Sequence, residues 1–540
     1  MRRALAVCLA VAISAQAEAA GAGSARRPAD ETPRLAVIIA VDGLSWERLN
    51  AARPWLSGGL KRLLDEGTVE TECRYGHLNT LTAPGHASLA TGVPPRLHGI
   101  PSNHWFVPGT GKAGMVDVYA ASQPLPGEAE GSTRTVAGAG RLRVPTLADR
   151  VTEKNSASKV VSIATKDRSA ILLAGRDPRH AVYWYDSGTY RSSDAFDRGS
   201  GAGAAAAAVV GRFNAEKAGP KLAAHLGVTW SRLPKKGPAA VTPEGLAALQ
   251  LPVLGPAFPH ALTGKDRSIE TSILWTPFID RLLADLAVDL LADDALALGR
   301  DDVPDVLALS FSSNDYISHD YGPESEEASE ALRALDVSIG RVLDELTRRV
   351  GRGRVVVALS ADHGFLSLAS AKRFPEQTIL DGLNTAVNSE LSRKGPPLVY
   401  RYDACSLWLD RAALAMPGAP ERSRVLAIVN RELTTRFKAV IERTFVVDDA
   451  FPVPPGDDLA AKAWNARVPG RSGDLFVVPR FGVLIGSADG KGTTHGSPWE
   501  YDVHVPLIFW GAGITARMSS TPTTPYELAP TLARRLHLEP

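Results

Sequence analysis

Residues 35–43 read Leu-Ala-Val-Ile-Ile-Ala-Val-Asp-Gly, an apolar run that stops at a carboxylate and a glycine. A run that is apolar at every position is typical of a strand buried on both faces, as in a parallel sheet. Similar runs recur at residues 159–164, 305–311, 354–359 and 505–510, and residues 278–298 and 325–350 have helical patterns. This alternation predicts an α/β fold with a mainly parallel central sheet and helices on both faces.

Polar side chains follow most of these predicted strands. They are Asp42, Lys166 with Arg168, Asn314 with Asp315, and Asp362 with His363. In sheets of this kind, ligands bind beyond the carboxyl ends of the strands. We therefore expect these side chains to converge on one site.

The composition is that of an ordinary large globular protein. The 540 residues are 44% hydrophobic and 22% charged, which is enough to bury a large core. The 60 Lys and Arg residues balance the 59 Asp and Glu residues, so the chain lacks the charge excess that marks nucleic-acid or anionic-membrane binding.

The N-terminus has the pattern of a secretory signal peptide. Two arginines follow Met1, a short apolar run comes next, and small residues with Ala-x-Ala spacing end the segment near residue 20. No stretch approaches the roughly 20 apolar residues that a membrane helix requires. We expect cleavage of residues 1–20, a tether at residues 21–34, and an exported protein in the periplasm or the medium. The remaining cysteines, Cys73 and Cys405, could form a disulfide or stay as buried thiols, and their spacing does not decide between these.

Two regions interrupt the strand and helix rhythm of the predicted catalytic domain, residues 35–540. Residues 192–268 are rich in Gly, Ala and Pro, and residues 372–473 contain a strand-like and a helical segment without clear alternation. We interpret both as insertions. The alanine run at residues 199–208 predicts a helix or loop filler without a functional role.

A helix start is predicted near Thr82, in the sequence Thr82-Ala-Pro-Gly-His. A threonine followed by a proline at an early helical position is typical of a capped helix N-terminus, where backbone N–H groups favour a negative charge. Taken alone, the segment favours an ordinary capping threonine, because a threonine hydroxyl is a weak nucleophile without help.

Six potential metal ligands lie at or beyond predicted strand ends: Asp42, Asp315, His319, Asp362, His363 and His495. Each aspartate alone is more simply a helix cap or turn former, and each histidine a satisfied polar residue. A joint set of carboxylates and imidazoles, however, suits catalytic zinc. One metal would lower the pKa of the Thr82 hydroxyl, and a second would neutralise the leaving oxygen. Asn103, Lys166 and Arg168 are candidate donors to the phosphoryl oxygens.

These segments resemble the alkaline phosphatase superfamily, and the resemblance spans almost the whole chain after the signal peptide. It is carried by Asp42-Gly43, the Thr82 segment, Asp315-x-x-x-His319, Ala361-Asp-His-Gly364 and Thr494-His-Gly496. The threonine nucleophile is similar to that of the nucleotide pyrophosphatase/phosphodiesterases. Asn103 and the Lys166-x-Arg168 pair look specifically like the phosphate-irrepressible alkaline phosphatases, which are monoesterases.

The resemblance implies an alkaline-phosphatase-like sandwich with inserted cap regions and two zinc ions. One zinc would be held by Asp42, Asp362 and His363, and the other by Asp315, His319 and His495. It also implies hydrolysis of small-molecule phosphate monoesters through a covalent phosphothreonine at Thr82. The alternatives are a phosphodiesterase or nucleotide pyrophosphatase with the same metal site, and a zinc-binding domain without catalysis. The oligomeric state is left open. A sulfatase is set aside, because the segment lacks the Cys/Ser-x-Pro-x-Arg context that sulfatases need.

Overall fold

The computed structural model describes residues 33–106, 115–117, 120–122, 135–232, 253–264, 267–447, 453, 455–487 and 492–539. The predicted signal peptide and residues 21–32 of the predicted tether lie outside these ranges. Within them, no helix combines the length and the apolar content needed to cross a bilayer. Cys73 and Cys405 are both free and buried, which answers the question that their spacing left open.

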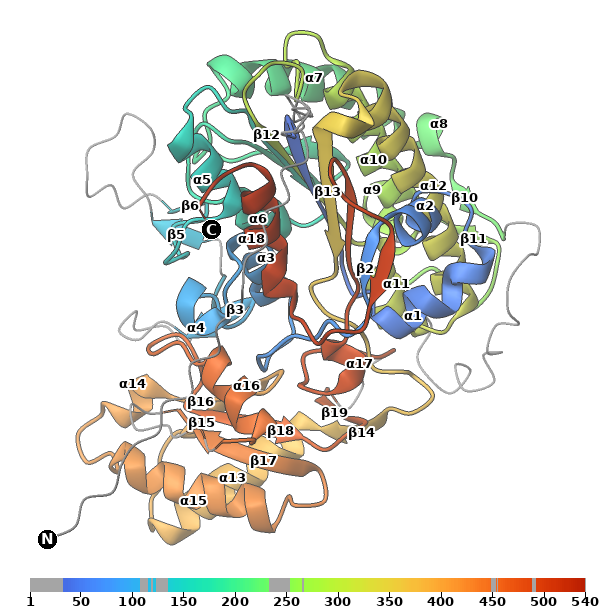
Figure 1. The fold of residues 1–540 in the computed structure, drawn as a ribbon. Coiled ribbons are helices and arrows are strands. Elements are labelled where there is room, and N and C mark those ends of the chain that lie inside the picture. Colours follow the sequence, from blue (N-terminus) through green and yellow to red (C-terminus); the bar gives the residue numbers. More distant parts are fainter. Residues whose placement is uncertain are drawn as a thin grey trace, which may run out of the picture. The chain divides into compact units, whose positions relative to one another are not determined.

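A nine-stranded sheet forms the centre of the fold (Figure 1). Its strand order is β21 (Arg517–Ser519), β2 (Thr68–Glu70), β20 (Leu507–Gly511), β13 (Val355–Ser360), β1 (Leu35–Val41), β12 (Asp305–Phe311), β7 (Val160–Ala164), β8 (Ala181–Asp186) and β9 (Thr189–Arg191). The five strands from β13 to β8 are parallel, which confirms the predicted mainly parallel sheet. The strand predicted at residues 505–510 differs, because β20 pairs antiparallel with β13. A strand buried on both faces is apolar throughout in either direction, so the pattern cannot reveal its orientation.

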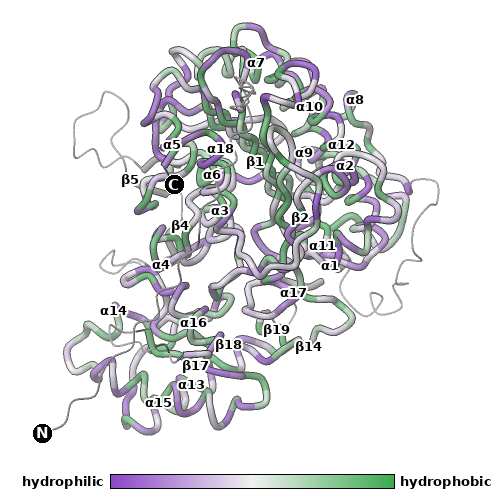
Figure 2. Tube along the Cα trace, viewed as in Figure 1, coloured by the Kyte–Doolittle hydropathy of each residue, from purple (hydrophilic) through white to green (hydrophobic). Residues whose placement is uncertain are grey.

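The central strands β1, β12 and β13 end at nearly the same height in the sheet, at the carboxyl ends that polar residues follow. All seven residues of β1 are buried, and the strands of the sheet are coloured mostly as hydrophobic in Figure 2. Val41 of β1 pairs with Phe311 of β12, and Ala40 pairs with Ser360 of β13. This register places the residues that follow β1, β12 and β13 at one edge of the sheet.

Helices cover both faces of the sheet (Figure 1). One layer contains α2 (Gly59–Glu66), α10 (Phe278–Ala292), α11 (Ser313–Tyr321) and α12 (Glu326–Arg349); the other contains α3 (Thr82–Thr91), α5 (Leu147–Lys154), α6 (Asp167–Ala174) and α18 (Leu528–Arg535). The helix predicted at residues 325–350 is therefore α12. The helix predicted at 278–298 ends earlier, because the Asp293 side chain accepts hydrogen bonds from the backbone N–H groups of Ala295 and Leu296 and turns the chain.

The described residues between 372 and 486 contain a second sheet with a hydrophobic core of its own. The sheet has four strands in the order β15 (Val399–Asp403), β16 (Ser406–Leu409), β18 (Leu475–Pro479) and β17 (Ile441–Val446). Helices α13 (Glu376–Glu390) and α15 (Arg422–Thr435) share its core, and β14 (Lys372–Pro375) pairs with β19 (Val483–Gly486). The domain boundaries remain our proposal, with this excursion reaching somewhat beyond the predicted residue 473.

The other predicted insertion, residues 192–268, falls partly outside the described ranges. The predicted alanine-rich filler is helix α7 (Gly201–Lys217). The remaining short elements are α1 (Trp46–Ala52), α4 (Pro95–His98), β3 (His104–Phe106), β4 (Met115–Asp117), β5 (Ala120–Ser122), β6 (Thr135–Ala137), α8 (Leu222–Leu226), β10 (Thr229–Trp230), β11 (His260–Ala261), α9 (Ile269–Ser272), α14 (Arg411–Leu414), α16 (Asp458–Ala466) and α17 (Glu500–Val503).

Candidate active site

Four neighbouring strands deliver charged side chains to the same edge of the sheet. In sheet order, β13 is followed by Asp362 and His363, β1 by Asp42, β12 by α11 with Asp315, and β7 by Lys166. All five of these side chains are buried. The structure thus brings these strand-end residues together, as the sequence predicted; Arg168 is described below.

The first candidate metal group contains Asp42, Asp362 and His363. Their ligand atoms all lie within 4.8 Å of one another. His363 Nε2 is 3.3 Å from Asp42 Oδ1 and 3.5 Å from Asp362 Oδ2. These three atoms are buried and have no hydrogen-bond partner among the described residues. Buried polar atoms are almost always satisfied, so this convergent, unsatisfied set fits a cation.

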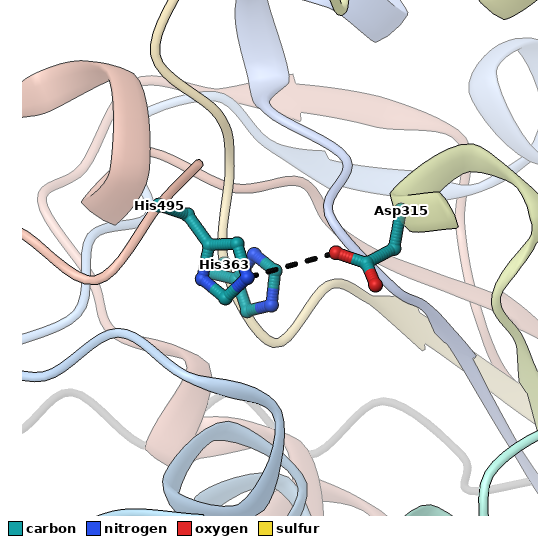
Figure 3. Close-up of side chains that lie close together, drawn as sticks. All are labelled: Asp315, His363 and His495. Atoms are coloured by element: carbon teal, nitrogen blue, oxygen red, sulfur yellow. Dashed lines mark ion pairs between the residues drawn. The ribbon is translucent and has the colours of Figure 1, made fainter. Parts of the chain in front are cut away.

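The second candidate group is built around Asp315. Its Oδ1 lies 3.4 Å from His319 Nε2, one helical turn along α11, and 3.6 Å from His495 Nε2. The rings of His363 and His495 stack with their centroids 3.4 Å apart and their planes 9° apart, and Asp315 points towards them (Figure 3). The ligand atoms of Asp315, His363 and His495 also lie within 4.8 Å of one another. His363 therefore joins the two groups, and His319 lies at the outer side of the second.

Backbone carbonyls fix the orientation of the three histidines. His319 Nδ1 is 3.0 Å from Thr493 O, His363 Nδ1 is 3.0 Å from Gly364 O, and His495 Nδ1 is 2.8 Å from Thr80 O. Since a carbonyl only accepts, each Nδ1 carries the hydrogen, which leaves each Nε2 directed at the carboxylates. A metal-ligating histidine has this arrangement, with the second nitrogen donating to a fixed acceptor.

The charges of the cluster are strongly coupled. Burial and Asp315 would raise the pKa of Asp42, but Lys166 and His363 outweigh them and hold it below its ordinary value. Burial would lower the pKa of His363, yet Asp362 and Asp42 raise it to about 9. In the protein without metal, the Lys166 ammonium and the His363 imidazolium thus balance much of the charge of three buried carboxylates. The same carboxylates suit divalent cations.

Thr82 lies at the start of α3, but it is not the cap that the sequence predicted. Leu81 occupies the N-cap position without a side-chain hydrogen bond, and Thr82 is the first helical residue. Asn103 takes over the capping function, because its Oδ1 accepts a 2.8 Å hydrogen bond from the N–H of Ala83. The Thr82 hydroxyl is thereby released from capping, and it lies 3.5 Å from the ammonium of Lys166.

Lys166 and Arg168 occupy different environments. Lys166 Nζ lies 2.6 Å from Asp42 Oδ2 and 2.5 Å from Asp315 Oδ2, so it bridges carboxylates from both candidate metal groups. The Arg168 guanidinium lies 3.7 Å from Asp167, and its buried Nε has no hydrogen-bond partner in the described part of the chain. The structure brings Lys166 to Thr82. Arg168 forms no described hydrogen bond with either residue, but its positive charge lies near enough to lower the pKa of Lys166.

Two supporting residues, Ser312 and His86, were not identified from the sequence as partners of the candidate ligands. Ser312 donates from Oγ to Asp42 Oδ2 at 3.0 Å. His86 Nδ1 lies 2.8 Å from Thr82 O and 3.2 Å from Asp362 Oδ2, while its Nε2 is 2.8 Å from Ser310 Oγ. Because Thr82 and His86 are four residues apart on one helix, the sequence could have suggested the contact between His86 and the Thr82 carbonyl. The contact of Ser312 depends on the pairing of β12 with β1.

A cavity of about 370 Å³ adjoins the cluster. His319 and His495 line one part of it, and charged side chains from the second sheet, including Arg401 and Asp403, line another. A cavity of this size accommodates a small organic group.

Comparison with known proteins agrees with this geometry. The family model described as "Type I phosphodiesterase / nucleotide pyrophosphatase" matches residues 36–502. The chain is 28% identical to alkaline phosphatase PafA of Elizabethkingia meningoseptica, over 96% of this chain and 94% of that protein. It is 27% identical to alkaline phosphatase PhoK of a Sphingomonas species, over 95% and 90%.

The fold is also similar to a solved structure. The crystal structure of wild-type PafA superposes with a TM-score of 0.81 at 26% identity, covering 94% of this chain and 96% of that one. The family match, the relatives and the fold all agree with the resemblance that the sequence motifs carried. The chain belongs to the type I phosphodiesterase / nucleotide pyrophosphatase family of the alkaline phosphatase superfamily.

Proposed function

We propose that this protein is a metal-dependent phosphate-monoester hydrolase of the alkaline phosphatase type, with Thr82 as its nucleophile. The observation that carries the proposal is the Thr82 hydroxyl itself. It has no capping role, it lies at the positive end of a helix, and it is 3.5 Å from a buried ammonium that bridges the two candidate metal groups. Two relatives that are named alkaline phosphatases resemble this chain over nearly their whole length, which supports the same reaction.

Two zinc ions are the cofactors we propose. Asp42, Asp362 and His363 would hold one, and Asp315, His319 and His495 the other. Zinc at these positions would supply Lewis-acid stabilisation of charge and a lower pKa for a coordinated hydroxyl. The buried, unsatisfied oxygens of Asp42, Asp315 and Asp362 support this assignment.

The residues of the chain would bind and orient the phosphoryl group. Burial would lower the pKa of Lys166, but Asp315 and Asp42 raise it well above its ordinary value, so this side chain acts as a fixed cation and not as a base. It would stabilise negative charge beside Thr82 Oγ1 in a buried environment, where such an interaction is stronger than in bulk water. Thr82 Oγ1 would form a bond to phosphorus as the bond from phosphorus to the ester oxygen breaks, and the hydroxyl proton would end on the departing alcohol. Water would then attack phosphorus and break its bond to Thr82 Oγ1, which releases inorganic phosphate and restores the hydroxyl.

We propose a monoester as the substrate because of the cationic groups that follow β7. A monoester presents three non-bridging oxygens carrying nearly two negative charges, whereas a diester presents two such oxygens and one charge. Lys166 and Arg168 therefore favour the monoester, with Asn103 as a further donor. The alcohol portion would occupy the cavity of about 370 Å³ beside His319 and His495.

Hydrolysis of diesters is the alternative function, which the name of the matching family model favours. It would use the same Thr82 and the same metal site, and it would differ in how much catalysis depends on Lys166 and Arg168. Export to the periplasm or the medium remains part of the proposal and rests on the predicted signal peptide.

The nucleophile is tested by comparing Thr82→Ala, Thr82→Ser and the wild-type protein at full zinc occupancy. We expect Thr82→Ala to lose nearly all turnover of p-nitrophenyl phosphate, while Thr82→Ser retains much of it because a hydroxyl remains. A Thr82→Ala protein with full zinc content and near wild-type turnover would exclude the assignment. The ratio of kcat/KM for p-nitrophenyl phosphate and bis-p-nitrophenyl phosphate separates monoesterase from diesterase.

A further inference from the structure

A carboxylate from another helix caps the N-terminus of α11. Asp280 lies on α10 and is 1% exposed. Its Oδ1 accepts hydrogen bonds from the backbone N–H groups of Ser312 (3.1 Å) and Ser313 (3.2 Å), and its Oδ2 accepts from the Ser313 hydroxyl. No cation contacts Asp280 among the described contacts. Burial raises the pKa of Asp280 to about 6, and the hydrogen bonds from Ser313 and Ser312 offset part of that effect.

The usual cap of this helix is thereby left free for a different contact. Ser312 is the N-cap residue of α11, where a serine side chain normally accepts a hydrogen bond from the N–H of N2 or N3. Here Ser312 makes no such bond, and its Oγ donates to Asp42 Oδ2 at 3.0 Å. Because Asp280 performs the capping, the hydroxyl of Ser312 can orient a candidate metal ligand.

The same turn connects the two metal groups. Asn314, the next residue but one, donates from Nδ2 to the backbone oxygens of Gly43 (2.8 Å) and Asp42 (3.2 Å). Asp315 follows directly and supplies the carboxylate of the second group. The position of residues 312–315 therefore determines both the orientation of Asp42 and the place of Asp315.

We propose that Asp280 is a positioning residue of the metal centre, which acts through Ser312 on Asp42 and through the start of α11 on Asp315. This role rests on the proposed function, since it assumes that these carboxylates hold the metals. Partners of metal ligands typically change metal affinity by about 10- to 100-fold when they are removed. Asp280 forms no hydrogen bond or ion pair with a proposed ligand among the described contacts, although its charge repels that of Asp42. Its effect on the position of the ligands therefore travels through the turn that it holds, and Asp280→Asn separates this effect from that of the charge.

The chain provides a matched control. Asp336 on α12 is also buried and caps another helix, because it accepts hydrogen bonds from the N–H groups of Ser57 (2.7 Å), Gly58 (2.5 Å) and Lys61 (3.1 Å) at the start of α2. Helix α2 carries none of the proposed ligands. Asp280→Ala and Asp336→Ala thus remove the same kind of helix cap. Only the helix capped by Asp280 carries proposed metal ligands.

The test measures zinc affinity by competition with a chromophoric chelator, together with thermal unfolding of the zinc-free proteins. We expect Asp280→Ala to bind zinc about 10- to 100-fold more weakly and Ser312→Ala about tenfold more weakly. Asp336→Ala should keep wild-type zinc affinity. Asp280→Asn should stay within about threefold of wild type, because its Oδ1 can still accept from both backbone N–H groups.

Several results would overturn the role of Asp280. They are wild-type zinc affinity in folded Asp280→Ala, an equal loss of affinity in Asp336→Ala, or a loss in Asp280→Asn as large as in Asp280→Ala. If Asp280→Ala does not fold, Asp280→Asn and Ser312→Ala still decide the matter, since wild-type affinity in Ser312→Ala would break the proposed path to Asp42. Zinc affinity is measured without substrate, so an inactive protein would count against the proposed function and leave this inference standing.

Discussion

Replacing Lys166 by methionine tests two roles of this buried cation: balancing the charge of the carboxylates in the zinc-free protein, and stabilising the phosphoryl group during catalysis. The side chain is 4% exposed, and its Nζ contacts Asp42, Asp315 and Thr82 at 2.6, 2.5 and 3.5 Å. Methionine fills a similar volume and cannot donate or carry charge. Lys166→Met therefore removes the cation while leaving the packing of the site largely intact.

The expected magnitudes follow from these contacts. In the zinc-free protein, two buried carboxylates lose their cation, which costs about 3–5 kcal/mol of unfolding free energy. Zinc would supply positive charge to the same carboxylates, so the cost should be much smaller in the zinc-loaded protein. For catalysis, one charge-assisted hydrogen bond to a phosphoryl oxygen contributes about 1.5–3 kcal/mol, or roughly ten- to a hundredfold in kcat/KM. A diester should lose considerably less.

The assay combines guanidinium unfolding, with zinc or with chelator, and kcat/KM for p-nitrophenyl phosphate and bis-p-nitrophenyl phosphate at saturating zinc. Lys159→Met is the control, because Lys159 lies at the opposite end of β7, 2.6 Å from Asp301 and 3.3 Å from Asp305. It should destabilise the protein equally with and without zinc and leave the monoester-to-diester ratio unchanged. The reasoning would be refuted if Lys166→Met lost the same factor on both substrates, or if zinc left its destabilisation undiminished.

Three further predictions concern buried groups. Burial lowers the pKa of His77 to about 3 from about 6.5 when unfolded, so its neutral form contributes stability that is complete above pH 6.5 and lost as pH falls. His77→Gln should remove about 4 kcal/mol of the acid destabilisation between pH 6.5 and 3.5, measured by urea unfolding of zinc-free protein; an unchanged pH profile would contradict this. Burial raises the pKa of both Cys73 and Cys405, so Ellman's reagent should label neither in the native protein and both after unfolding, with a third only if the predicted signal peptide is retained. A Cβ on Gly85 would meet the Asp362 Cβ and backbone oxygen at 2.5 Å, so Gly85→Ala should cost about 1–3 kcal/mol and lower turnover, whereas Gly211→Ala in open space on α7 should stabilise by about 0.5–1 kcal/mol; equal effects in thermal unfolding would count against the contact.

Local patterns were sufficient for the central elements of the fold. The apolar run at residues 35–41 coincides with β1. The run at 305–311, which is apolar except for Asp305 and Ser310, coincides with β12. Strands buried on both faces are rich in apolar residues, which makes them visible in the sequence. Strand β8 of the central sheet, which contains three aromatic residues and ends at Asp186, was not predicted. The short strands β2, β9 and β21 were not predicted either. Each has only three residues and lies at or near an edge of the sheet, where too few positions are buried to produce a pattern.

The residue types at the candidate site were sufficient to predict its candidate ligands and nucleophile. The hydrogen-bond partners of those residues could not be predicted. The helix start near Thr82 was predicted, yet the capping group is Asn103, twenty residues away, and Thr82 itself is not the cap. The start of α11 likewise contains a serine of the kind that caps helices, yet Asp280 from another helix caps it. In both cases a side chain distant in sequence replaces a local hydrogen bond, and local propensity contains no information about such a replacement.

The order of the strands in the sheet decides which charged side chains contact one another. Along the chain, the strand-end residues come in the order Asp42, Lys166, Asp315, Asp362, whereas across the sheet the order is Asp362, Asp42, Asp315, Lys166. Asp42 lies after the strand between β13 and β12, so it can contact His363 on one side and the start of α11 on the other. Its two oxygens are accordingly divided, with Oδ1 facing His363 and Oδ2 bound by Ser312 and Lys166. A carboxylate held on one oxygen by the protein keeps the other for a metal, so the central place of β1 makes Asp42 the ligand whose orientation both Asp280 and Lys166 can influence.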